Sequence, residues 1–280
     1  MSEIKKVRKE GMDKFYTIPS ISLKCINIIS SKYNWNNWDL VVEPSAGNGS
    51  FLMQIPTEKK IGIDIYPEHS DITEMDFFNY NPPDGLSNIL VIGNPPFGRI
   101  SSTAVKFFNH SAQWASTIAF ILPKTFRRIS IQNRLNRLFH LIYDDDIPSE
   151  PCSFNPPMQA KCCFQIWEKK EEFRDFIKLS NNHKDWDFLP YGPINSKGQP
   201  TPPIEADFAI LAYGGKCGTL VYTELDKLSP KSWHWIKSKI NISLLIERFN
   251  NLDYTLSQNT ARQNSIGRGE LVKLYSESYG

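Results

Sequence analysis

The sequence has 280 residues, of which 40% are hydrophobic and 22% charged, and its formal net charge is +2. This composition excludes a mostly disordered chain, and the small net charge excludes a histone-like polycation without excluding a nucleic-acid partner. No apolar run approaches the roughly 18 residues of a membrane span, and no apolar stretch follows the basic N-terminus as in a secretory signal. We therefore expect a soluble intracellular protein, cytoplasmic or nuclear, that does not bind membranes.

The cysteines and histidines carry no metal-binding pattern. The chain has five cysteines without a Cys-x-x-Cys pair, and five histidines without the spacing of a ligand set. This favours free thiols over disulfides, and we expect no metal site.

The first predicted element is a helix over residues 19–33, where apolar residues recur at helical spacing. Short apolar runs and helix-like stretches follow. The runs predict strands at 39–44, 60–65, 88–93, 116–123, 140–145 and 161–169, and the stretches predict helices at 101–115 and 130–140. Continuous apolar strands that alternate with helices predict a mostly parallel α/β sheet covered on both faces. No helix separates the last two strands, which indicates an antiparallel end hairpin.

The sequence changes in character near residue 180. Residues 181–203 are rich in Pro, Gly and polar side chains and predict a loop or linker. Residues 205–224 predict a hairpin around Gly214-Gly215, whereas 231–240 and 242–256 look helical. The chain is therefore expected to have an α/β domain at 1–175 and a small appended α+β region at 176–280. Polar side chains of this region, Asn259, Thr260, Arg262 and Arg268, are candidates for substrate contacts.

A glycine turn, Glu43-Pro44-Ser45-Ala46-Gly47-Asn48-Gly49, follows the first predicted strand of the sheet. Glycines at such a turn let the backbone approach a ligand closely, although a tight structural turn is the alternative. Asp64 ends the next strand, where a carboxylate can accept hydrogen bonds from ribose hydroxyls. Asp76-Phe77 follows, and these side chains could contact an adenine ring, although Phe77 could equally belong to the core.

A second turn, Gly93-Asn94-Pro95-Pro96-Phe97-Gly98, ends a buried strand with an amide, two prolines and an aromatic ring. Prolines end strands in any case, so a plain turn is one interpretation. The order of motifs along the chain favours a functional interpretation of this turn. The segments FYT (15–17), EPSAGNGSF (43–51), GIDI (62–65), DFF (76–78), GNPPFG (93–98) and AFILP (119–123) resemble the S-adenosylmethionine-dependent N6-adenine methyltransferases, over about residues 12–170.

The resemblance implies a Rossmann-like class I methyltransferase fold, with a catalytic domain at 1–175 that binds S-adenosylmethionine and a candidate substrate-recognition element at 176–280. For residues 15–17, a staple on the first helix is the alternative to cofactor binding. The resemblance implies cofactor contacts from Phe15, Tyr16, Thr17, Glu43, Ser45, Gly47, Gly49, Asp64, Ile65, Asp76, Phe77 and Asn94.

The resemblance also assigns catalysis to Asn94, Pro95, Pro96 and Phe97. The exocyclic nitrogen of adenine is a poor nucleophile because its lone pair is delocalised into the ring. Asn94 Oδ1 and the Pro95 carbonyl would each accept one N–H, while the two prolines hold these acceptors in place. Phe97 would stack on a base that is flipped out of a duplex or already single-stranded.

Basic side chains follow the predicted strand 116–123. Lys124, Arg127 and Arg128 could grip phosphates at the mouth of the site, although a solvated run of charge is an equal alternative. Arg134 and Arg137 continue this cluster, and a second basic cluster comprises Lys5, Lys6, Arg8 and Lys9.

The expected substrate is adenine in nucleic acid, with DNA favoured and RNA as the alternative. A catalytically silent, nucleic-acid-binding partner subunit is a weaker alternative, because the motifs are intact. Protein-glutamine methylation is another, since those enzymes carry a similar NPPY turn, but Phe97 favours a planar base. Whether a protein partner supplies substrate contacts stays open.

Overall fold

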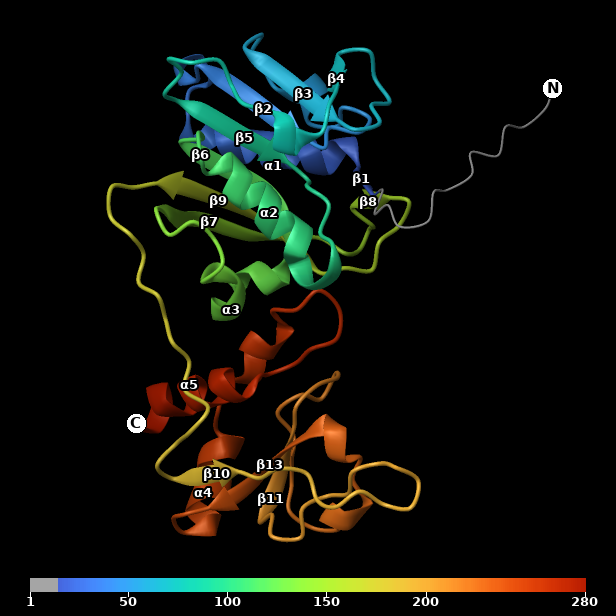
Figure 1. Ribbon diagram of the computed structural model, residues 1–280, viewed down its shortest axis with the longest axis vertical. Helices are drawn as coiled ribbons and strands as arrows, with labels where there is room; N and C mark the ends of the chain where they lie inside the picture. Colours follow the sequence, from blue (N-terminus) through green and yellow to red (C-terminus); the bar gives the residue numbers. More distant parts are fainter. Residues whose placement is uncertain (1–14) are drawn as a thin grey trace, which may run out of the picture. The chain divides into compact units, whose positions relative to one another are not determined.

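The computed structural model describes residues 15–280 (Figure 1). The basic cluster Lys5, Lys6, Arg8 and Lys9 lies outside the described residues. The chain divides into two compact units, Met1–Phe176 and Ile177–Gly280. The catalytic and recognition roles expected of the two regions stay predictions.

The first unit is built around a seven-stranded sheet with the order β4-β3-β2-β5-β6-β9-β7. The strands β2 to β6 are mutually parallel, whereas β9 is antiparallel to both of its neighbours, β6 and β7. The predicted α/β fold, mostly parallel with an antiparallel end, is therefore confirmed. The strands are β2 (Leu40–Pro44), β3 (Lys60–Asp64), β4 (Ile72–Glu74), β5 (Ile89–Gly93), β6 (Thr117–Pro123), β7 (Phe139–Ile147) and β9 (Cys162–Lys169).

Helices α1 (Pro19–Lys32) and α2 (Ser102–Ser111) cover opposite faces of this sheet (Figure 1). Val41 packs in the hydrophobic cluster that contains residues of α1, and Val42 packs in the cluster that contains residues of α2. Both faces of the strands are thus buried, which is why the strand sequences are continuously apolar.

The parallel strands bring the predicted motifs to one edge of the sheet. β2 is the neighbour of both β3 and β5, and Val42 pairs with Val91 in the register with β5. Pro44 at the end of β2 therefore lies beside Gly93 at the end of β5, and Asp64 ends β3 on the other side. Ligands of open α/β sheets bind at this carboxyl edge.

Two predicted helical regions of the first unit are shorter than expected. Residues 130–140 form only α3 (Ile129–Gln132), and Phe139 already begins β7. The Asn136 side chain accepts a hydrogen bond from the Leu138 backbone at 3.0 Å, a local bond that competes with helix continuation. The helix expected at 101–115 ends at Ser111. A 3₁₀ turn, Leu52–Gln54, follows the glycine turn.

The second unit contains a four-stranded antiparallel sheet with the order β10-β13-β11-β12. The sheet packs against two helices through a core that includes Trp186, Phe249 and Tyr275. The predicted hairpin is confirmed by the pairing of β11 with β12. The elements are β10 (Trp186–Phe188), β11 (Phe208–Leu211), β12 (Leu220–Val221), β13 (Trp233–Ser238), α4 (Ile242–Asn250) and α5 (Arg268–Tyr279).

The prediction of a helix over residues 231–240 is wrong. This segment contains β13, which lies between β10 and β11 and pairs with both through the backbone. The segment expected to be a linker, 181–203, contains the strand β10, which its polar composition does not predict. The helix predicted at 242–256 is divided into α4 and a 3₁₀ turn, Tyr254–Gln258.

Candidate active site

The glycine turn after β2 has three residues with positive φ: Ser45 (56°), Gly47 (55°) and Gly49 (79°). At Gly47 a side chain is also excluded by contact, because an added Cβ would lie 2.6 Å from Cε1 of Tyr16. The turn thus needs glycine for its backbone conformation and for the close approach of an aromatic ring.

Asp64 ties the end of β3 to this turn. Its Oδ2 accepts a hydrogen bond from the Gly47 backbone at 2.9 Å, and its Oδ1 accepts one from the Tyr66 backbone at 2.8 Å. Each carboxylate oxygen has a second lone pair, so the group retains capacity to accept from a ligand hydroxyl. Ile65 is 48% exposed directly beside it.

Glu43 lies beneath the turn rather than on its surface. It is 3% exposed, and its Oε2 accepts a hydrogen bond from the Leu52 backbone at 2.7 Å. Burial raises the pKa of Glu43 to about 8 despite hydrogen bonds from the Leu52 and Phe51 backbones, and the charge of Asp64 adds to the increase. Glu43 therefore connects β2 to the segment that follows the glycines.

The segment 15–17 passes over the same edge. β1 (Tyr16–Thr17) pairs antiparallel with β8 (Phe154–Asn155). The Tyr16 hydroxyl donates to Glu68 Oε1 at 2.5 Å, and burial together with this bond raises the pKa of the phenol. The Thr17 hydroxyl oxygen is buried without a hydrogen-bond partner among the described residues.

Asn94 connects this segment to the end of β5. Its Nδ2 donates to the Phe15 carbonyl at 3.2 Å, which orients the amide. Its Oδ1 is buried, and no described residue donates a hydrogen bond to it. A buried acceptor without a donor lowers stability by about 1–3 kcal/mol, so a ligand that donates an N–H to this oxygen would satisfy it.

The remainder of the turn is rigid and partly buried. Pro95 is buried, and Pro96 and Phe97 are half-buried. The Phe97 ring packs in part against the hydrophobic cluster that contains α1. The turn therefore holds an amide, two rings of fixed φ and an aromatic side chain within four consecutive residues.

Asp76 and Phe77, which were predicted to act together, lie in different environments. Asp76 Oδ1 caps a 3₁₀ turn by accepting from the Phe78 backbone at 3.0 Å. Phe77 is 3% exposed and stacks on Phe107 with ring centroids 5.1 Å apart, so it occupies the core, which the sequence left as the alternative. The exposed ring here belongs to Phe78, which is 40% exposed.

The basic residues after β6 are bound within the chain. Arg127 makes a bidentate ion pair with Asp144, whose nearest contact is 2.6 Å, and Lys124 pairs with Asp146 at 2.5 Å. The bond to Asp144 raises the pKa of Arg127. The pKa of Asp146 is lowered overall, because hydrogen bonds from Lys124 and Arg127 outweigh the opposing effect of partial burial. The predicted phosphate contacts of Lys124 and Arg127 would have to break these pairs. Arg128 has a contact of its own within the chain.

Sequence reasoning missed the partners of these side chains. Glu68, Asp144 and Asp146 complete the contacts of Tyr16, Arg127 and Lys124, and the Phe15 carbonyl accepts a hydrogen bond from Asn94. The run of three aspartates at 144–146 was a visible signal, because it lies on a strand that follows the basic segment. No spacing rule predicts the contact between Tyr16 and Glu68.

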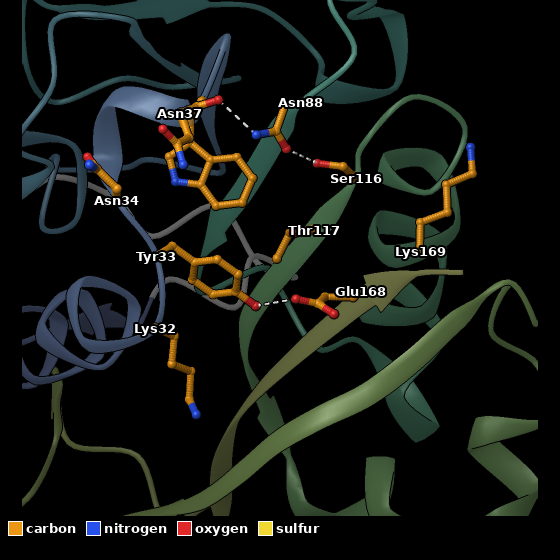
Figure 2. A pocket seen from close by; sticks show the side chains of 10 residues that line it. Lys32, Tyr33, Asn34, Asn37, Asn88, Ser116, Thr117, Glu168 and Lys169 are labelled. Atoms are coloured by element: carbon orange, nitrogen blue, oxygen red, sulfur yellow. Dashed lines mark hydrogen bonds between the residues drawn. The ribbon is translucent and has the colours of Figure 1, made fainter. Parts of the chain in front are cut away.

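A separate cavity of about 350 Å³ lies at the opposite edge of the sheet, where β2, β5 and β6 begin (Figure 2). The Tyr33 hydroxyl donates to Glu168 at 2.8 Å and the Ser116 hydroxyl donates to Asn88 at 2.8 Å; both bonds are drawn as dashed lines in Figure 2. None of the residues predicted to bind cofactor or substrate lines this cavity, so we place the candidate site at the carboxyl edge.

Among residues 15–280, no group of three or more His, Cys, Asp or Glu side chains could hold a metal ion. No helix in the same part of the chain is both long and apolar enough to cross a membrane.

Comparisons with known proteins give structural likeness at low sequence identity. No protein-family model matches the chain, and a search of curated proteins finds no match. A proposed RNA methyltransferase from Pyrococcus horikoshii is similar at 13% identity and a TM-score of 0.42, over 56% of this chain and 87% of that one.

Two other methyltransferase structures are similar over nearly the same share of the chain. Magnesium protoporphyrin IX methyltransferase from Synechocystis, with bound S-adenosylmethionine, matches at 9% identity and a TM-score of 0.40, over 54% of this chain and 79% of that one. The N-methyltransferase NodS from Bradyrhizobium japonicum matches at 11% identity and a TM-score of 0.38, over 55% of this chain and 94% of that one. The fold assignment rests on the strand order described above.

Proposed function

We propose that this chain transfers the methyl group of S-adenosylmethionine to N6 of adenine in nucleic acid, with DNA as the favoured substrate. The observation that carries the proposal is the buried Oδ1 of Asn94 at the end of β5, which accepts no hydrogen bond from any residue of 15–280 and lies beside the glycine turn that follows β2. A buried acceptor at the edge where α/β sheets bind ligands calls for a substrate with an N–H group.

The cofactor would lie against the glycine turn. Gly47 and Gly49 are buried at positive φ and carry no side chain that would fill the turn, and Asp64 can accept from ribose hydroxyls. Ile65, Met75 and Phe78 are each at least 38% exposed, and the Met75 backbone donates to the Asp64 carbonyl at 2.9 Å, so apolar side chains flank Asp64 for a planar base. When bound, S-adenosylmethionine supplies a methyl group already activated by a sulfonium, so the chain needs no metal for this step.

The residues at 15–17 would close the other side of this pocket. The Tyr16 ring lies on the glycine turn. The buried Thr17 hydroxyl has no hydrogen-bond partner in the described part of the chain, and a ligand carboxylate or amine could provide one. The Phe15 carbonyl fixes the Asn94 amide, so this segment connects cofactor binding to the orientation of the acceptor.

The chemistry follows from the orientation of two acceptors. Since Asn94 Nδ2 is engaged with Phe15, Oδ1 is the atom available to accept an adenine N–H. The Pro95 carbonyl would accept the other, and the two bonds would draw the nitrogen toward a tetrahedral geometry with its lone pair free to attack the methyl carbon. As the N–C bond forms, the C–S bond would break to leave S-adenosylhomocysteine, and the displaced N6 proton would pass to water. The fixed φ of Pro95 and Pro96 keeps both acceptors in place without reorganisation. Phe97 would stack on the adenine ring.

One experiment tests the proposal. The parent chain and the Asn94→Ala variant are incubated with labelled S-adenosylmethionine and, in separate reactions, with DNA, RNA and a protein pool. The exposed Asn182→Ala variant in the second unit is the matched control. The proposal expects label in adenine for the parent and the control, and at least about a 100-fold lower rate for Asn94→Ala. Label in glutamine side chains, or in no substrate, would contradict it, whereas label in RNA alone would change only the substrate class.

A further inference from the structure

The backbone directly after the catalytic turn is strained. Gly98, Ile100 and Ser101 have φ values of 66°, 52° and 57°, so three of four consecutive residues have positive φ. Gly98 has to be glycine, because an added Cβ would overlap the Thr103 hydroxyl oxygen. At Ile100 the conformation is unfavourable, since a β-branched side chain at positive φ crowds its own backbone.

The surrounding structure holds this conformation in place. The Ser101 and Thr125 hydroxyls hydrogen-bond at 2.8 Å, the Ala104 backbone donates to the Phe97 carbonyl at 3.3 Å, and Arg134 donates to the Ile100 carbonyl at 3.5 Å. Strain that the fold maintains in this way clusters at ligand-binding and active sites.

The result of the strain is an aliphatic side chain that projects from the surface. Ile100 is 74% exposed, and it follows Phe97 by three residues, so the two Cα atoms are at most about 11 Å apart. A single exposed Ile is ordinary on a protein surface. An exposed Ile on an unfavourable backbone, next to the turn that would hold the target base, is not accounted for by packing.

We propose that Ile100 is a positioning residue that enters the base stack of a duplex at the place vacated by the flipped adenine. Extruding a base leaves its neighbours unstacked, and inserted apolar side chains, Ile among them, are a known way in which proteins occupy opened base steps. An aliphatic side chain fits this role because it fills the gap by contact and needs no particular base opposite. The inference rests on the proposed adenine methylation and adds that the substrate is double-stranded DNA.

The test compares one DNA preparation in its native and heat-denatured forms, with methyl transfer to adenine as the readout. Ile100→Ala and Ile100→Gly remove the wedge, Ile100→Leu keeps its bulk, and Leu23→Ala, at an exposed position on α1, is the control. We expect the Ala and Gly variants to lose about tenfold or more on native DNA, and to stay within about twofold of the parent on denatured DNA. Ile100→Leu and Leu23→Ala should retain activity on both.

The Gly variant separates a functional role from a structural one. Glycine adopts positive φ without strain, which offsets the greater entropy of its unfolded chain, so Ile100→Gly should keep the melting temperature close to that of the parent while it lowers activity on native DNA. Equal losses on both DNA forms, no loss on either, or a parent chain active only on denatured DNA would each overturn the wedge and leave adenine methylation standing. A parent chain that methylates no adenine in DNA would overturn the wedge, and one that methylates adenine in no nucleic acid would overturn both.

Discussion

Replacing the buried Glu43 by glutamine should remove a pH dependence from the stability of the first unit. Burial raises the pKa of this carboxyl to about 8, whereas a glutamate in an unfolded chain titrates near 4.3. Between these values the folded state holds one more proton than the unfolded state. Stability therefore falls as pH rises, by about 1.4 kcal/mol per pH unit, and this contribution is fully present only below the lower value.

The expected size of the effect is about 2–3 kcal/mol between pH 5 and pH 7. The amide in the Glu43→Gln variant would have no proton to lose and would keep an oxygen for the Leu52 backbone, which donates to Glu43 at 2.7 Å in the parent. The variant should therefore lack this slope. The stability of Glu43→Gln relative to the parent should therefore be higher at pH 7 than at pH 5.

Hydrogen-exchange mass spectrometry of peptides from β2 and β5 measures this unit separately from the second one. Protection is recorded from pH 5 to pH 8, corrected for intrinsic exchange, for the parent, Glu43→Gln and the exposed control Glu58→Gln. The control should follow the parent. Parallel profiles for the parent and Glu43→Gln would show that the buried carboxyl is not protonated, and would refute the reasoning.

Three further predictions concern the site. Asn94→Ala should leave the Kd for S-adenosylmethionine within about threefold by calorimetry while methyl transfer falls about 100-fold or more; a comparable loss of cofactor binding would contradict the assigned role. Gly47→Ala should weaken cofactor binding by at least about tenfold, because it adds a clash to the strain of positive φ. Gly85→Ala, with a φ of 86° and no atom of the described residues within 4 Å of an added Cβ, should lose only the cost of backbone strain, about 1–2 kcal/mol of stability; equal cofactor affinity for these two variants would argue against the role of the turn. Arg127→Ala should lower the unfolding free energy by about 1–2 kcal/mol, and Asp144→Ala in the same chain should recover part of that loss; strictly additive losses in urea titrations would contradict the ion pair.

Six of the seven strands of the sheet were predictable because each of them carries its own signal, whereas the three-residue edge strand β4 was not predicted. The runs that end at Pro44, Asp64 and Gly93 are continuously apolar, and parallel packing under two helical layers explains that pattern. Once the strands are adjacent, their carboxyl ends bring the glycine turn and the Asn94 turn together without any further information.

The remainder depended on contacts between distant residues. Residues 233–238 form a strand because two other strands bond to them, although their apolar pattern also suits a helix. The aspartates at 144–146 were a visible signal for ion pairs with the basic segment after β6, but the sequence does not show which of them Arg127, seventeen residues before Asp144, contacts. Phe77 illustrates the same limit: the sequence offers a cofactor contact or a core position, and packing against Phe107 decides for the core.

The most direct measurement is the mass of nucleosides from DNA incubated with the chain and S-adenosylmethionine bearing a deuterated methyl group. Our account predicts that deuterated methyl appears on N6 of deoxyadenosine with the parent chain and is absent with Asn94→Ala. Equal label with the two chains would contradict the account, as would label on any atom other than an exocyclic adenine nitrogen.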